Sequence, residues 1–200
     1  MRKIKKRGVK KKNNLFNESI EYIKESRMFI LAGVIIFFAS SLLGFIFSPY
    51  LGGIFNSLIA DLMSQISGLG TFDLIVFIFK NNFSSSIITV FLGVFLGVFP
   101  IFNAILNGAI LGYVAAIVSS QESFFALWRL LPHGIFELPA IFIAIGIGIK
   151  FGFAFFAEKG KVKKELLYRL DKSLKVVVFI ILPLLIIAAI IEGLLIGIGS

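Results

Sequence analysis

The chain has 200 residues, of which 58% are hydrophobic and only 16% are charged, which is far from the composition of a soluble domain. Its net charge of +9 comes from basic clusters beside apolar runs, a pattern typical of topology signals and of contacts with anionic lipids rather than of nucleic-acid binding. The absence of cysteine excludes disulfides, thiolate catalysis and Cys-ligated metal sites.

The N-terminal segment, residues 1–27, is predicted to be a basic tail followed by a short juxtamembrane helix. Asn17 is expected to cap this helix, with Glu18 and Glu21 in its first turn. Apolar residues alternate with charged ones along it, so we expect the helix to lie along the membrane surface.

Residues 28–197 are predicted to form a single transmembrane domain. Residues 28–47 are apolar, end at Ser48-Pro49, and are long enough to cross the bilayer. Residues 51–63 carry apolar side chains at helical spacing with polar residues between them, which favours an amphipathic helix on the outer surface. Residues 72–79 are apolar but too few to cross the bilayer alone.

The apolar stretch 84–119 is longer than one crossing requires, and Pro100 interrupts it near the middle. We therefore expect two helices, 84–99 and 104–118, with Asn103 and Asn107 satisfying the backbone at the turn. The last two spans are predicted at 133–157 and 174–196. The expected fold is an all-α polytopic bundle of five transmembrane helices.

Charge parity supports this count. The loop 158–175 is rich in Lys and Arg, as is the N-terminus, and the positive-inside rule assigns both to the cytoplasm. An even number of crossings must then separate them. The predicted location is the cell membrane, with several spans and a cytoplasmic N-terminus. A re-entrant hairpin at 84–119 would have the same parity and stays open as an alternative.

Glycine pairs four residues apart recur in the predicted spans. Such pairs let helix backbones approach closely, which favours packing where lipid removes the usual hydrophobic force. Packing within the chain is the main interpretation, and a homodimer is the alternative. The candidate packing residues are Gly93, Gly97, Gly108, Gly112, Gly148 and Gly152.

Ionisable and amide side chains within the apolar runs form the candidate site. His133 and Glu137 are four residues apart and share a helix face, and Glu192 is at a similar outer depth in the last span. Asn81 and Asn82 are expected to introduce the second span from the same side. A structural hydrogen-bonded cluster, a metal site, and proton or ion handling are the alternatives, of which the structural cluster is favoured.

Three motifs resemble those of a known family. An Asn-Gly-x-x-x-Gly segment runs from Asn107 to Gly112, a His-Gly-x-x-Glu segment runs from His133 to Glu137, and Glu192 follows in the last span. From about residue 15 to 197 the chain resembles the stage II sporulation protein M family, also called DUF95. The resemblance implies a multi-spanning membrane platform that, in endospore-forming bacteria, serves a cell-wall-degrading amidase and a lytic transglycosylase during engulfment.

Catalysis is not expected, because no nucleophile with a base, no paired aspartates and no zinc-binding motif occur. No cofactor or resident metal is predicted. We expect a non-enzymatic scaffold whose partners are the lipid bilayer, anionic lipids at the basic N-terminus, and other membrane or envelope proteins. The alternative is a small transporter or channel that uses the outer polar residues.

Overall fold

The structure is a computed structural model that describes residues 14–121 and 131–199; the side chains of 131–133 and 197–199 are not described. It is an all-α bundle, as the sequence predicts, and the described part contains five helical segments long and apolar enough to span a membrane. The elements in chain order are α1 (Leu15–Glu25), α2 (Arg27–Ile46), α3 (Ser48–Ile66), α4 (Thr71–Phe91), η1 (Leu92–Val94), α5 (Val98–Gln121), α6 (Leu131–Gly152), η3 (Phe153–Phe156), α7 (Val162–Val176), η4 (Val177–Ile181) and α8 (Leu182–Gly199).

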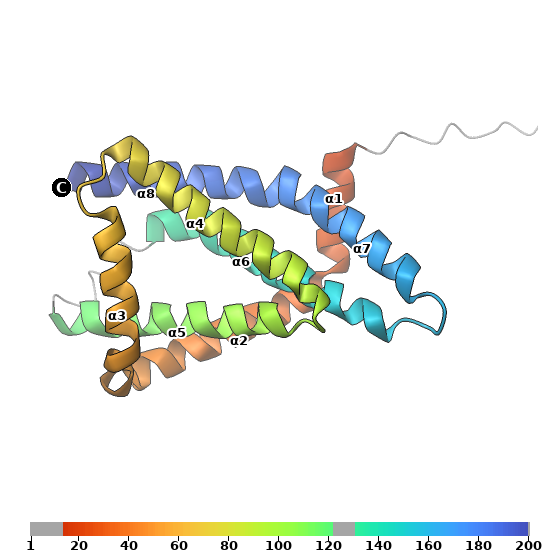
Figure 1. Ribbon diagram of the computed structural model, residues 1–200, viewed down its shortest axis with the longest axis horizontal. Helices are drawn as coiled ribbons and strands as arrows, with labels where there is room; N and C mark the ends of the chain where they lie inside the picture. Colours follow the sequence, from red (N-terminus) through yellow and green to blue (C-terminus); the bar gives the residue numbers. More distant parts are fainter. Residues whose placement is uncertain (1–13, 122–130, 200) are drawn as a thin grey trace, which may run out of the picture.

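The spanning helices run along the long axis of the molecule, whereas α3 crosses it at one end and α1 crosses it near the other (Figure 1). We call these ends the α3 end and the α1 end. Helix α6 is central: 56% of its most apolar stretch is buried, against 33% or less for the other four spans. It packs against α2, α4, α5 and α8.

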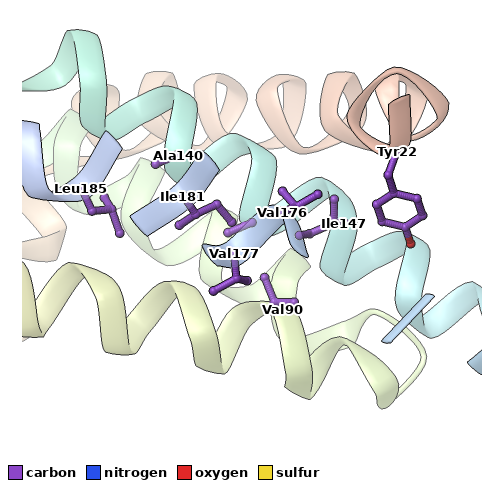
Figure 2. Packing of buried hydrophobic residues seen from close by; sticks show 9 residues of the cluster. Tyr22, Val90, Ala140, Ile147, Val176, Val177, Ile181 and Leu185 are labelled. Atoms are coloured by element: carbon purple, nitrogen blue, oxygen red, sulfur yellow. The ribbon is translucent and has the colours of Figure 1, made fainter. Parts of the chain in front are cut away.

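The main apolar core joins α6 to α4 and to the α7–α8 segment (Figure 2). Val90, Ile147 and Ile181 are among its fully buried side chains. Most other large apolar residues face outward, as expected where the surrounding solvent is lipid rather than water. The aliphatic core therefore closes the interior of the bundle between its centre and the α1 end.

The predicted juxtamembrane helix is present as α1, but its N-cap differs from the expected one. Asn14, and not Asn17, is the N-cap, and its Oδ1 accepts a hydrogen bond from the backbone N–H of Phe16 at 3.3 Å. The helix begins earlier because Asn14 already offers a cap with extended backbone. Helix α1 crosses the bundle and packs against α7, which buries Ser19 and Tyr22.

Helix α4 corrects the prediction for the second span. It begins at Thr71 rather than at 84, and it includes the stretch 72–79, which was predicted to be too short to cross alone. The polar residues 80–82 do not interrupt it, because no Gly or Pro breaks the backbone there and tertiary contacts override weak local propensity. Asn81 and Asn82 consequently lie near the middle of this 21-residue helix and not at its outer start.

The stretch 84–119 contains parts of two helices, α4 and α5, but the turn between them is not at Pro100. It lies at 95–97, where Leu96 has a φ of 55° and Gly97 a φ of 76°. Gly97 adopts this left-handed conformation without a Cβ penalty. Pro100 instead occupies the first turn of α5, where its missing N–H leaves no helical hydrogen bond unmade.

The last predicted span is the end of a longer helical segment that runs from α7 through η4 into α8. The five residues of η4 are π-helical. Pro183 follows two residues after η4 ends, and it has no N–H to donate to the carbonyl of Phe179 four residues earlier. The π-helical turn accommodates this missing bond without ending the helix.

Candidate functional site: a polar cavity inside the bundle

Glu137 lies in the second turn of α6, two residues before Pro139 in the helix interior. Three cavities of about 120, 220 and 390 Å³ meet at this residue, since Glu137 lines all of them. The smallest, which we call the Glu137 cavity, is enclosed by α4, α5 and α6. Its lining residues are Asn81, Asn82, Ser85, Ser86, Thr89, Asn103, Asn107, Glu137, Ile141 and Ala144.

Side-chain hydrogen bonds join two walls of the Glu137 cavity. The Nδ2 of Asn103 on α5 donates to the Oγ of Ser85 on α4 at 3.3 Å. The Nδ2 of Asn107 donates to the carbonyl and the Oδ1 of Asn103, at 3.0 and 3.1 Å. The two asparagines were expected to satisfy the backbone of a turn at Pro100. The turn lies elsewhere, so they form part of the cavity wall instead.

The two larger cavities border the Glu137 cavity at Glu137 and are lined in part by α3. Glu192 of α8 lines both, as does Leu62 of α3. Asn81 and Asn82 line the smaller of the two. The structure thus brings together four of the five predicted polar residues around connected cavities.

The fifth predicted residue, His133, belongs to α6, but its side chain lies outside the described part of the structure. Its predicted pairing with Glu137 therefore stays a prediction. Glu192 takes part in an interaction of its own.

Helix α3 covers the larger cavities from one end of the bundle. Phe55 is its one buried residue, and the ring of Phe55 packs edge-on against Tyr113 of α5 with centroids 5.3 Å apart. The hydroxyl of Tyr113 donates a hydrogen bond to the Oδ1 of Asn56 at 2.5 Å. These contacts fix the first half of α3, while Leu62 and Met63 reach the cavities from the second half.

The candidate packing glycines lie at contacts between helices of one chain. Gly108 and Gly112 of α5 face α2, and a Cβ on Gly112 would overlap the carbonyl of Ser41. Gly93 and Gly97, around the turn after α4, face α6. A Cβ on Gly93 would meet the backbone of Gly148, and one on Gly152 would meet the backbone of Gly93 and Gly97. Backbone approaches of this kind are open only to glycine.

A second group of charged residues at the α1 end was not predicted. Lys150 of α6 is nearly buried, with 11% of its side chain exposed, and its Nζ lies 3.3 Å from Oε2 of Glu25. The same Nζ lies 4.0 Å from the ring centroid of Tyr22, a cation–π contact. Glu18, Tyr22 and Glu25 share one face of α1, and this spacing is the signal from which docking of α1 could have been inferred.

Glu18 forms the other half of this contact. Its Oε2 lies 2.9 Å from the Nζ atoms of both Lys172 and Lys175 on α7. The hydrogen bonds from Lys175 and Lys172 hold the pKa of Glu18 below its usual value of 4.5. Burial raises the pKa of the Tyr22 hydroxyl, which lies in the same interface. Helix α1 is thus held to the bundle through α6 and α7.

The polar groups that line the Glu137 cavity are suited to binding a ligand. The cavity presents amides, hydroxyls and one carboxylate, which can hydrogen-bond a small polar ligand or coordinate a hard cation. Within residues 14–121 and 131–199, no three His, Cys, Asp or Glu side chains come together to hold a metal ion.

An all-α bundle with five apolar spans and a polar cavity between them defines a multi-pass integral membrane protein. The chain belongs to the stage II sporulation protein M family, whose model matches residues 30–195. It is 33% identical over 127 residues to an uncharacterized protein of Methanocaldococcus jannaschii, an alignment that covers 60% of this chain. The chain spans about half of that relative, 54% of its length. No solved structure matches the chain.

Proposed function

We propose that this protein is a non-enzymatic platform of the cell membrane that recruits other membrane or envelope proteins through α3, with its N-terminus in the cytoplasm. Membership of the stage II sporulation protein M family supports a role of this kind. The observation that carries the proposal is the placement of α3. This amphipathic helix lies across the end of the bundle, where Phe55 is its one buried residue and several of its large apolar side chains are exposed.

The exposed side chains of α3 favour contact with a partner. Tyr50 is 83% exposed and Met63 is 59% exposed, although both are large and apolar. Asp61 and Gln65 are exposed on the same helix, so the surface mixes apolar and polar groups. Aromatic residues and methionine are enriched at protein interfaces, whereas a purely lipid-facing helix would have no use for the polar ones.

The closed interior supports a platform over the alternative, a transporter or channel. The connected cavities widen toward the α3 end, whereas the aliphatic core around Val90, Ile147 and Ile181 fills the bundle on the way to the α1 end. A channel needs a continuous polar passage.

Photo-crosslinking in native membranes tests the proposal. Benzoylphenylalanine replaces Tyr50 in one variant and Phe156 in the other. Phe156 is the matched control, because it is aromatic, 71% exposed and part of η3, the segment that follows α6. We expect discrete protein adducts from position 50 that are absent from position 156. Adducts with lipid alone at position 50, or the same protein adducts at both positions, would contradict a docking role for α3.

A further inference from the structure

The Glu137 cavity places one carboxylate among neutral oxygen and amide groups in the membrane-spanning part of the bundle. Its polar lining comes from α4, α5 and α6, and among the described lining residues none is Lys, Arg or His. Glu137 is the one carboxylate among the described residues that line this cavity. A charged carboxylate in low dielectric requires a partner, because desolvation without compensation is costly.

We propose that the Glu137 cavity binds a monovalent metal cation, with sodium as the probe. Hard cations prefer carboxylate, amide carbonyl and hydroxyl oxygens, and the cavity wall supplies all three kinds. A single positive charge neutralises Glu137, the one carboxylate among the described residues that line this cavity. The proposal is independent of any partner that α3 recruits.

The size of the cavity agrees with a partly hydrated ion. Its volume of about 120 Å³ exceeds the roughly 30 Å³ that one water molecule occupies in the liquid, so an ion with a few waters fits. Thr89 and Ser86 are almost fully buried, at 3% and 4% exposure, and place two hydroxyl groups on the α4 wall. The hydrogen bond from Asn103 to Ser85 holds α4 and α5 at a fixed separation.

The two larger cavities share Glu137 with this one and are lined in part by α3, so an ion can approach the site from the α3 end. Glu192 lines the two larger cavities but not the Glu137 cavity. On the opposite side, the backbones of Gly93 and Gly148 are in close contact and the aliphatic core is fully buried. The ion therefore binds and leaves by the same route.

Thermal unfolding of the purified full chain in nanodiscs tests the site. Sodium chloride and potassium chloride are each compared with choline chloride at equal ionic strength, because the methyl groups of choline keep its charge from direct coordination by oxygen ligands. We expect a rise in Tm of about 3–6 °C in at least one metal salt when its concentration is about tenfold above Kd. Equilibrium binding of radioactive sodium should saturate at a single ion per chain.

Two variants assign the effect to this cavity. Glu137→Gln should abolish the cation-dependent rise in Tm, and Thr89→Val, which keeps the side-chain volume, should lower the cation affinity severalfold. Glu158→Gln is the control, since Glu158 is 78% exposed in the loop at the α1 end, and it should respond as the wild type does. Equal Tm values for the wild type in all three salts would overturn the proposal, as would a response to divalent ions alone or one that Glu137→Gln retains.

Discussion

The carboxylates of Glu18 and Glu137 show how differently this chain treats negative charge. Glu18 forms ion pairs with Lys172 and Lys175 and lies at the α1 end, outside the spans. Glu137 lies inside a span and borders three cavities. The first arrangement holds two helices together, and the second leaves an acceptor available to a ligand. The charge of Glu18 thus stabilises helix packing at the α1 end, whereas Glu137 is the proposed ligand of a cation inside the bundle.

At the level of residues, the pairing of Glu18 makes the stability of the fold depend on pH. Its pKa is lower in the folded state than the ordinary 4.5, so its stabilising contribution is complete above that value. The contribution is lost as the pH falls from 4.5 through the folded pKa. We expect Glu18→Gln to lower Tm in detergent at neutral pH and to have little effect well below the folded pKa.

Glu21 provides the control on the same helix, because it is exposed and no ion pair is formed by it within the described part of the chain. Glu21→Gln should change Tm little at either pH. An equal loss of Tm in both variants at neutral pH would show that the pairing with Lys172 and Lys175 does not stabilise the fold.

At the level of elements, the attachment of α3 depends on a small number of contacts. Tyr113→Phe keeps the ring that packs on Phe55 and removes only the hydrogen bond to Asn56. The expected cost is about 1 kcal/mol, typical of one hydrogen bond. Hydrogen–deuterium exchange should therefore speed up in α3 while exchange in α5 stays slow.

Tyr50→Phe is the matched control, because it also removes a tyrosine hydroxyl but at an exposed position of α3. Exchange in α3 should be unchanged in this variant. Faster exchange throughout the bundle in Tyr113→Phe would instead mean that the hydrogen bond stabilises the whole fold.

The sequence predicted that the helices exist more accurately than it predicted where they begin and end. Hydropathy identified five spans and the amphipathic α3, because lipid exposure demands long apolar stretches. It placed the start of α4 too late, since Lys80, Asn81 and Asn82 resemble a boundary when their neighbours are unknown. It also gave Pro100 the role that Gly97 has in the turn, although proline is equally suited to the first turn of a helix.

The candidate site was predicted in part. Glu137 and Glu192 were singled out because a carboxylate in a span is costly. The α4 hydroxyls were not, since serine and threonine satisfy themselves within helices and carry little signal. The contact between Lys150 and Glu25 was missed as well, because it joins positions 125 residues apart and no local pattern encodes that pairing.

At the level of the whole molecule, the proposed orientation puts the α1 end in the cytoplasm and the α3 end outside. The chain has no cysteine of its own, so single cysteines report on topology directly. An impermeant thiol reagent added to intact cells should label Ser67→Cys in the exposed loop after α3 and should not label Lys163→Cys in α7. Ser173 would be unsuitable, because it is fully buried.

Cell lysis supplies the control for this experiment, since the cysteine at position 163 should then react as readily as the one at position 67. Labelling of position 163 in intact cells, with position 67 unreactive until lysis, would mean that the orientation is reversed.

The pairing of α2 with α5 has a consequence for how the chain is made. These two helices form the most extensive helix–helix contact in the described structure, and Gly44, Gly108 and Gly112 allow it. Synthesis runs from the N-terminus, so α2 enters the membrane while α5 has yet to be translated. The small-residue face of α2 must wait beside lipid until the α4–α5 hairpin arrives. Assembly of the bundle is therefore a late event in translation, and a ribosome that stalls before α5 leaves α2 without its principal partner.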